Sequence, residues 1–395
     1  MTLTLLLDLD DTLLNTNVDV FVPAYFKALS KHLASRVSPD VMLPALTSGT
    51  QLMNESEDFT RTLEEVFDAE FYPKLGIPKV QLLEAIDEFY DEIFPTLGKF
   101  TSPRADTAPF IDWAFRQGYR IAIATDPLLP RKATYHRVRW AGIAPERFEL
   151  ISTFDHFHFS KTHSAYYAEV LGCMGWPDGP VLMVGNDMER DIIPACRLGL
   201  ATYHIDDAPA SRSGTEAGGR GKLSDLRPWL ESTDLSALEP DFKSPQAIIA
   251  MLSASPAVLH SISSTLSQVE WTNEPTPSDW ALTEIVCHLR DTEREIHHVQ
   301  IKLFDQTDPF IPRPDTSVWA KQRKYLNENG QDALGQFASA RLETLSLLKN
   351  VQDGGWSRSA RHAIFGPTNF MEVAGFMADH DRMHIQQAWK TIQSG

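Results

Sequence analysis

The stretch LLLDLDDTLL at residues 5–14 sets three aspartates directly behind a run of leucines. The run has the length and composition of a buried strand, so the carboxylates are expected where that strand ends. Two further runs have the same form, YRIAIATD at 119–126 and PVLMVGND at 180–187. Helical patterns follow all three, which predicts a parallel sheet with helices on both faces. Because ligands bind beyond the carboxyl ends of such strands, the polar residues of the three runs are expected in one crevice.

The length, net charge and cysteine content of the chain exclude several classes of protein. The chain has 395 residues, and single cores stop growing at roughly 250–300 residues, which favours two domains. A net charge of −17 disfavours nucleic acid and anionic membrane surfaces as partners. Cys173, Cys196 and Cys287 are scattered without disulfide or metal spacing, and no secretion signal or long apolar run is visible. We therefore expect a soluble cytoplasmic protein without disulfides.

The residues between the first and second strands read mostly as helix, for example FVPAYFKALSKHLASRV at 21–37. An insertion of this size is too large for a simple crossover and predicts a helical cap at about 16–100. The segment 207–222 is rich in Gly, Ser and Ala, which predicts a loop. LSDLRPWLES at 223–232 then predicts a helix that closes the first domain.

Strand patterns stop near residue 240, so we expect a first domain at 1–238 and a linker at 239–244. The second domain, 245–395, shows helical patterns alone, which predicts a four-helix bundle. Its helices are expected at roughly 245–268, 279–305, 328–350 and 369–392. The predicted fold class is an α/β doubly wound parallel sheet, a Rossmann-like core with a helical cap, plus a separate all-α four-helix bundle.

The first crevice carries the groups that phosphoryl transfer requires. Asp8, Asp10 and Thr12 form a DxDxT pattern where the first strand ends. A carboxylate such as Asp8 can attack phosphorus directly. A second carboxylate, Asp10, can protonate the leaving oxygen and later activate water. Thr125 offers a hydrogen bond to the phosphoryl group, and Lys161, in FSKTHS, offers a charge that neutralises it.

Two further carboxylates, Asp187 and Asp191, follow the third strand in GNDMERD. So many anions at one sheet edge require a cation, and oxygen ligands beside a phosphate indicate Mg²⁺. Asp11 lies one residue off the alternation and is expected to be a solvated or capping acid. Asp126 is expected to begin the turn before Pro127.

The order of these motifs resembles the haloacid dehalogenase superfamily, over about residues 1–235. The resemblance implies that Asp8 is the nucleophile and Asp10 the general acid and base, while Thr125 and Lys161 bind the phosphate. Dehalogenases of this superfamily lack the acid/base aspartate, so Asp10 favours phosphoryl chemistry over carbon–halogen cleavage. Thr-His-Ser follows the lysine where members of the superfamily frequently have Pro-x-Pro. The loop after Lys161 therefore departs from the pattern of the superfamily.

The same resemblance implies a Mg²⁺ site made by Asp8, the main-chain carbonyl of Asp10 and Asp187, with Asp191 in support. It also implies that the helical cap shapes the choice of substrate. The cap sequence contains acids and aromatics and few basic residues. It does not indicate a particular leaving group.

The last predicted helix carries histidines on an apolar face. Its residues at steps of three and four are Phe370, Val373, Met377, His380, His384 and Ala388. Asn369 and Glu372 have the spacing of a capping box at its start. A second stripe, on the second bundle helix, comprises Ile285, Thr292, Ile296, Val299 and Leu303, with His288 and Leu289 at its centre. A histidine pair at i, i+4 with a third from a neighbouring helix can hold a metal and leave positions open for water or substrate.

SDWALTEIVCHLRDTE at 278–293 and HDRMHIQQ at 380–387 resemble the DinB/YfiT-like family of metal-binding four-helix bundles, over about 245–395. The resemblance implies that His288, His380 and His384 ligate a divalent transition metal, Zn²⁺ or Ni²⁺. Members of that family include thiol-dependent transferases and hydrolases.

The motif HDRMH at 380–384 is also similar to the HExxH of zinc proteases, with Asp381 in place of the glutamate. Those enzymes take a third ligand downstream, and here no His, Asp or Glu follows the motif. A metalloprotease is therefore disfavoured. His297, His298 and His362 are expected to be hydrogen-bonded core residues.

The sequence thus predicts a phosphatase that acts on a small phosphorylated metabolite, fused to a metal-binding bundle. Two alternatives stay open. In one, the bundle is the principal enzyme and the first domain is preparatory. In the other, the bundle is a structural module, for example the interface of a homodimer.

Overall fold

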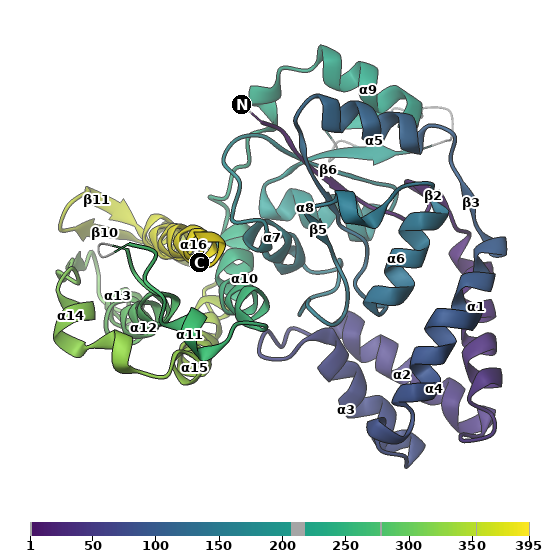
Figure 1. The fold of residues 1–395 in the computed structure, drawn as a ribbon. Helices are drawn as coiled ribbons and strands as arrows, with labels where there is room; N and C mark the ends of the chain where they lie inside the picture. The colour runs from purple at the N-terminus through teal and green to yellow at the C-terminus, as the bar shows by residue number, and fades with distance from the viewer. Residues whose placement is uncertain (1, 207–217, 277–278, 353, 395) are drawn as a thin grey trace. The chain divides into compact units, whose positions relative to one another are not determined.

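A computed structural model describes residues 2–206, 218–276, 279–352 and 354–394. Contacts divide the chain into two compact units, and Figure 1 shows the elements of each. The first unit comprises Met1–Val170 and Asp178–Pro240, and the second comprises Leu171–Pro177 and Asp241–Gly395. Cys173, Cys196 and Cys287 form no disulfide in the described part of the chain.

The first unit is built on a six-stranded sheet in which every neighbouring pair is parallel. The central strand β1 (Thr4–Leu7) is fully buried and lies between β4 (Arg120–Ile123) and β6 (Val181–Gly185). The order is β5-β4-β1-β6-β7-β8, in which the other strands are β5 (Leu150–Ile151), β7 (Ala201–Ile205) and β8 (Gly219–Gly221). The predicted parallel sheet is confirmed.

Strand β8 corrects the loop prediction at 207–222. Residues 207–217 lie outside the described part of the chain, but Gly219–Gly221 pairs with β7 as an edge strand. A Cβ atom on Gly219 would lie 2.5 Å from the Tyr203 ring and 2.7 Å from the Trp229 ring. Glycine is therefore required here because two large rings pack against the main chain, and composition alone does not distinguish this from a flexible loop.

Helices cover both faces of this sheet, as the alternating pattern predicts. Figure 1 shows α5 (Thr107–Arg116) and α9 (Leu223–Ser232) on one side, and α7 (Ser164–Cys173) and α8 (Ile193–Leu198) on the other. Leucines of β1 pack with α5 and α9 in one apolar cluster. The sheet is therefore buried between helices, and the carboxyl ends of its strands lie along one edge.

The predicted helical cap is present between β1 and β4. It contains α1 (Val18–His32), α2 (Pro39–Glu55), α3 (Leu63–Leu75) and α4 (Leu83–Glu88), followed by short turns to Phe100. Its aromatic residues form a core of its own. A two-stranded ribbon of β2 (Leu14–Asn15) and β3 (Ser102–Pro103) joins the chain where it leaves the sheet and where it returns.

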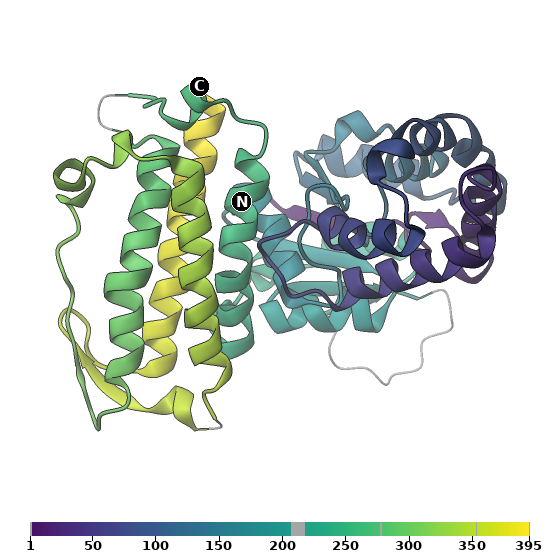
Figure 2. The same ribbon diagram turned by 90° about the horizontal axis from the view of Figure 1, so that it is seen from below.

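The second unit is a four-helix bundle, as predicted, and Figure 2 shows its long helices side by side. They are α10 (Pro245–Ser263), α12 (Leu282–Thr292) continued by α13 (His298–Leu303), α15 (Gly330–Lys349) and α16 (Phe370–Ser394). A small sheet is formed by β9 (Phe310–Ile311), β10 (Ser359–His362) and β11 (Gly366–Asn369). By length and composition α10 is apolar enough to span a membrane, but 67% of its apolar window is buried, as in a core helix.

A π turn changes which residues face the interior on the helix that carries His288. The predicted stripe through Ile296, Val299 and Leu303 is wrong beyond Thr292, because Glu293–His297 forms a π turn. A π turn inserts one extra residue per turn, so each later inward position moves one residue along the chain. His297, Gln300 and Phe304 are accordingly buried, and Val299 is 48% exposed.

The start of α16 is capped as its spacing predicts, but only in part. Asn369 Oδ1 accepts a hydrogen bond from the Glu372 amide over 3.0 Å. The Glu372 carboxylate instead accepts from the Thr368 hydroxyl, 2.6 Å away. The stripe of α16 is buried at Phe370, Val373, Met377, His384 and Ala388.

Candidate active site and candidate metal centre

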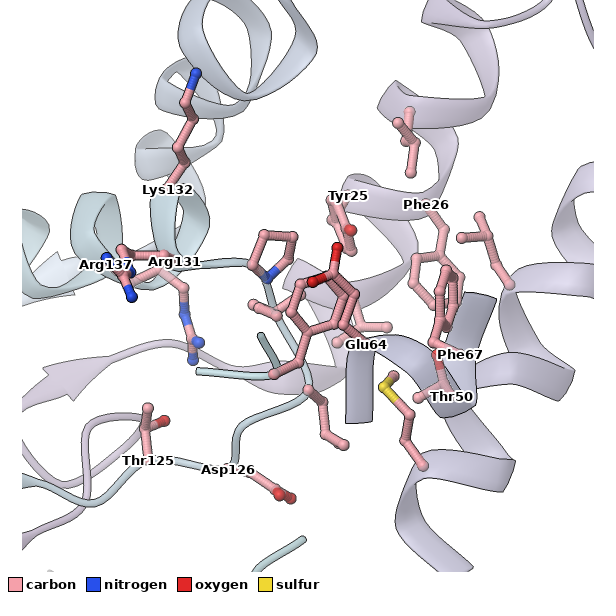
Figure 3. A pocket seen from close by; sticks show the side chains of 18 of the residues that line it. Tyr25, Phe26, Thr50, Glu64, Phe67, Thr125, Asp126, Arg131, Lys132 and Arg137 are labelled. Atoms are coloured by element: carbon pink, nitrogen blue, oxygen red, sulfur yellow. The ribbon is translucent and has the colours of Figure 1, made fainter. Parts of the chain in front are cut away.

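The strand ends of the first unit open into one cavity of about 630 Å³. Asp8 follows β1, Thr125 follows β4 and Asp187 follows β6, and all three line it. Figure 3 shows Thr125 and Asp126 on one side of the pocket and the cap residues Phe26 and Phe67 on the other. The residues predicted at the crevice are thus brought together because parallel strands end at one sheet edge.

Lys161 joins two of the carboxylates. Its ammonium nitrogen donates to Asp8 Oδ1 over 2.6 Å and also pairs with Asp191. All three side chains are buried. Burial disfavours the ammonium, but the charges of Asp191 and Asp8 outweigh it and raise the pKa of Lys161 well above its usual value. Burial, with the charge of Asp8, raises the pKa of Asp191 to about 7.

Asp10 is held by two side chains that the sequence did not reveal as partners. The Thr16 hydroxyl donates to Asp10 Oδ1 over 2.5 Å, and Arg137 of α6 (Arg131–Trp140) forms an ion pair with the carboxylate. Arg137 is buried, and burial lowers its pKa to about 10. Thr12, the last residue of the DxDxT pattern, donates to the Asn186 side chain over 3.2 Å and so ties two strand ends together.

The Thr125 hydroxyl is buried and has no hydrogen-bond partner among the described residues. A buried hydroxyl without a partner is costly unless a ligand completes it. Its neighbour Asp126 accepts from the Lys161 amide over 3.2 Å and pairs with Arg190. Asp126 therefore does more than begin a turn, because it fixes the loop that carries the lysine.

The remaining acids organise the loops around the cavity. Asp187 Oδ1 accepts from the Glu189 amide over 2.8 Å, and Asp191 Oδ2 accepts from the Asp187 amide over 2.9 Å. Asp11 has φ +55° and accepts from the Thr16 amide over 2.8 Å. Asp11 is predicted to be a solvated or capping acid, and its carboxylate holds the loop before α1 by accepting from the Thr16 and Asn17 amides.

The donor set at these strand ends suits a hard cation. The carboxylates of Asp8 and Asp187 and the main-chain carbonyl of Asp10 are all oxygen ligands, which Mg²⁺ prefers. The residues therefore fit the metal that the sequence predicts.

In the second unit, His288, His380 and His384 form a group whose ligand nitrogens lie within 4.8 Å of one another. His288 Nε2 and His380 Nε2 are 3.1 Å apart, close to the spacing of about 3.3 Å that tetrahedral Zn–N bonds require. His384 Nδ1 lies 2.9 Å from Gln387 Oε1. Since the amide oxygen only accepts, Nδ1 carries the proton and Nε2 is left to ligate.

All three imidazoles are in the neutral form that binds metals. Burial, followed by the neighbouring imidazoles, lowers the pKa of His288 to about 2 and that of His384 to about 4. Burial also lowers the pKa of His380. The ring of Trp280 stacks on His384 with centroids 5.9 Å apart and so fixes the plane of that imidazole. The three predicted ligands therefore fit a transition metal.

A buried ionic network supports this group. Arg341 is fully buried and binds Glu293 through two hydrogen bonds of 2.8 Å. It also donates to Asp381 Oδ2 over 2.6 Å. Asp381 precedes His384 by three residues, and Glu293 accepts from His297 Nδ1 over 2.9 Å. The Asp381 carboxylate is thus a structural partner of an arginine, which the sequence did not reveal.

The other bundle histidines are hydrogen-bonded, as predicted. His298 Nε2 donates to the Ala340 carbonyl over 3.0 Å, and His362 Nδ1 accepts from the Ile364 amide over 3.2 Å. His297 and His362 also line a cavity of about 390 Å³ with His380. Of the three candidate ligands, His380 therefore lies at the wall of a space that a small molecule can enter.

The comparisons with known proteins agree with both halves of this description. A family model for haloacid dehalogenase-like hydrolases matches residues 2–199, and one for the DinB superfamily matches residues 251–388. The chain belongs to the haloacid dehalogenase-like hydrolases and carries a DinB domain. It is accordingly a hydrolase. A comparison with curated proteins gave no significant match.

Several solved structures are similar to one half of the chain. A HAD phosphatase from Thermococcus onnurineus is 20% identical, with a TM-score of 0.39, and the match covers 58% of this chain and 98% of that one. The 2-haloacid dehalogenase from Pseudomonas syringae pv. Tomato DC3000 is 17% identical, with a TM-score of 0.44, over 58% and 99%. YfiT from Bacillus subtilis, described as a probable metal-dependent hydrolase, is 16% identical, with a TM-score of 0.36, over 39% and 88%.

Proposed function

We propose that the first unit is a Mg²⁺-dependent phosphatase that hydrolyses a small phosphorylated metabolite through an aspartyl-phosphate on Asp8. One observation carries the proposal. A buried lysine bonds Asp8 over 2.6 Å, and the partnerless hydroxyl of Thr125 lines the same cavity. A nucleophile, a cation and a donor for a phosphoryl oxygen are thereby assembled at one point.

In the first step, Asp8 Oδ2 attacks phosphorus, since Lys161 occupies Oδ1. The bond from phosphorus to the leaving oxygen breaks, and Asp10, in its protonated form, gives that oxygen its proton. In the second step, water attacks phosphorus and gives its proton to Asp10. The bond from phosphorus to Oδ2 breaks, which releases inorganic phosphate and restores Asp8.

The other residues position the reacting groups and neutralise the charge of the phosphoryl group. Thr16 and Arg137 hold the Asp10 carboxylate at the cavity. Lys161 and Thr125 bind the equatorial oxygens of the phosphoryl group. Bound Mg²⁺, held by Asp8, the Asp10 carbonyl and Asp187 with Asp191 behind them, would neutralise phosphoryl charge.

The Asp8→Asn variant tests this proposal, because it keeps the shape of the side chain and removes the nucleophile. We expect phosphate release from phosphomonoesters to fall at least about 10³-fold, while Asp11→Asn, which preserves a cap, changes it little. Acid-quenched wild type should carry a phosphoryl group on Asp8 by mass spectrometry. Substantial turnover in Asp8→Asn, or halide release from haloacids by the wild type, would contradict the mechanism.

A second candidate function belongs to the bundle. It is a metal-dependent hydrolase or thiol-dependent transferase, and the cavity of about 390 Å³ beside His380 favours it. Such an activity should survive Asp8→Asn and be lost in His384→Ala. A bundle that stays folded and dimeric after chelation, with no activity of its own, would instead indicate a structural module.

A further inference from the structure

The cavity of the first unit is much larger than a phosphoryl group needs. Its volume of about 630 Å³ falls in the range of roughly 300–1,000 Å³ that holds drug-sized ligands. The reactive residues occupy one side, and the cap helices enclose the other (Figure 3). Whatever leaves with the ester oxygen must therefore lie against the cap.

The cap side of the cavity is mainly apolar. Among the partly buried apolar residues that line the cavity are Val22, Phe26, Phe67 and Ile86 of the cap, and Leu129 and Phe154 of the loops that follow β4 and β5. The Phe67 and Phe154 rings lie 6.5 Å apart, centroid to centroid, and Phe67 also stacks on Phe71 at 4.7 Å. Such a wall binds an aromatic or aliphatic group by burial and ring contacts.

The cations of the lining already have carboxylate partners. Each of its cations has at least one carboxylate partner: Lys79, Arg131, Lys132, Arg137, Lys161 and Arg190. On the cap side, a carboxylate or a second phosphate on the leaving group would have to displace the carboxylate partner of Lys79, Arg131 or Lys132. An anionic leaving group would therefore lose its hydration there, and no unpaired cation of the described lining would offset that free-energy cost.

Two of the tyrosine hydroxyls on this side satisfy each other. The Tyr25 and Tyr90 hydroxyls bond each other over 2.7 Å. Thr16 is bonded to Asp10. A leaving group with many hydroxyls would lose its bonds to water wherever it lay against the apolar wall.

On the proposed phosphatase function, we infer that the leaving group of the substrate is an uncharged and largely apolar body, an aryl or alkyl group, that fills the cap side of the cavity. The substrate class is thus an amphiphilic phosphomonoester. Sugar phosphates and phosphorylated acids are disfavoured.

The test uses the full-length protein with Mg²⁺ and measures kcat/KM for methyl, butyl and hexyl phosphate, phenyl phosphate, a hexose 6-phosphate and phosphoglycolate. Each methylene buried in an apolar site contributes about threefold to fourfold. We therefore expect kcat/KM for hexyl phosphate to exceed that for methyl phosphate at least about a hundredfold. Phenyl phosphate should exceed the hexose phosphate and phosphoglycolate.

The variant Val22→Trp places bulk in the cavity, and Val20→Trp, on the same helix but 47% exposed and outside the lining, is its control. Val22→Trp should lower kcat/KM for hexyl phosphate at least about tenfold and for methyl phosphate by less, and Val20→Trp should leave both within about twofold. Thermal melting establishes that the variants fold. If Val22→Trp does not fold, the kcat/KM values of the wild type for the series of esters still test the inference.

The outcomes separate the two proposals. Turnover that depends on Asp8 but favours the hexose phosphate, or is independent of chain length, overturns this inference and leaves the phosphatase standing. A wild type that hydrolyses none of the esters overturns the phosphatase and this inference with it. A preference for alkyl and aryl esters that Val22→Trp weakens supports both.

Discussion

Lys161 Nζ lies 2.6 Å from Asp8 Oδ1, although the two residues are separated by 153 positions in the chain. The lysine also pairs with Asp191, so one buried cation joins the loops after β1 and β6. Two buried carboxylates depend on a single positive charge. The stability of the first unit and its proposed chemistry therefore depend on the same contact.

Replacing this lysine by methionine should destabilise the first unit. Lys161→Met leaves Asp8 and Asp191 buried without their cation, which costs about 3–5 kcal/mol of the free energy of unfolding. Urea unfolding without divalent cations measures the change. Lys132→Met is the control, because Lys132 forms exposed ion pairs and its loss should matter little. Equal effects of the two substitutions would contradict the prediction.

The three-histidine group should hold metal in the purified protein. We expect near-stoichiometric Zn or Ni by elemental analysis of untagged protein prepared without chelators. The double variant His380→Ala/His384→Ala should lose it. His260→Ala, a bundle histidine outside the group, should retain it. A metal-free wild type would contradict the prediction and leave the bundle as a scaffold.

The buried network around Arg341 should stabilise the bundle. Arg341→Met removes the cation that Glu293 and Asp381 share, which should cost about 3–5 kcal/mol. Denaturant unfolding followed by hydrogen exchange of the amides in the bundle helices measures this. Arg382→Met, at a partly exposed ion pair, serves as the matched control. A loss of metal in Arg341→Met without a loss of stability would instead assign the network to ligand positioning.

Acid should destabilise the metal-free bundle. The pKa of His288 is lowered to about 2 and that of His384 to about 4 in the folded chain, and unfolding returns both to about 6.5. Below that pH the unfolded chain binds more protons, so the free energy of unfolding falls as the pH decreases.

This contribution is fully present above pH 6.5 and is lost as the pH falls toward the folded values. We expect the melting temperature of chelator-treated protein to fall between pH 7 and pH 5. His288→Leu, which removes one of the groups, should show a shallower dependence. An unchanged slope in that variant would show that other groups control the acid response.

Much of the fold and of the first site follows from local patterns. The leucine run before Asp8 predicts a buried strand, and parallel strands place Asp8, Thr125 and Asp187 at one edge whatever the details of packing. Helical spacing likewise predicts that His380 and His384 share a face. These predictions rest on periodicity and chain direction, which neighbouring residues in the sequence determine.

The partners of these residues could not be predicted in the same way. Arg137 pairs with Asp10, and Arg341 joins Glu293 to Asp381. These partners are far apart in the chain, so the spacing of residues within one segment does not reveal them. A signal does exist, because both arginines lie on otherwise apolar helix faces. An arginine in that position must find a buried carboxylate, but the sequence does not say which one.

The sequence by itself determined the order of the main strands and long helices and most of the residues that face each core, because burial follows the hydrophobic period. Only the tertiary structure decided the π turn at Glu293–His297, the pairing of every cation around the first cavity, and the apolar character of its cap side. Each of these depends on which distant side chains meet, and that is settled by packing of the whole domain and not by any single segment.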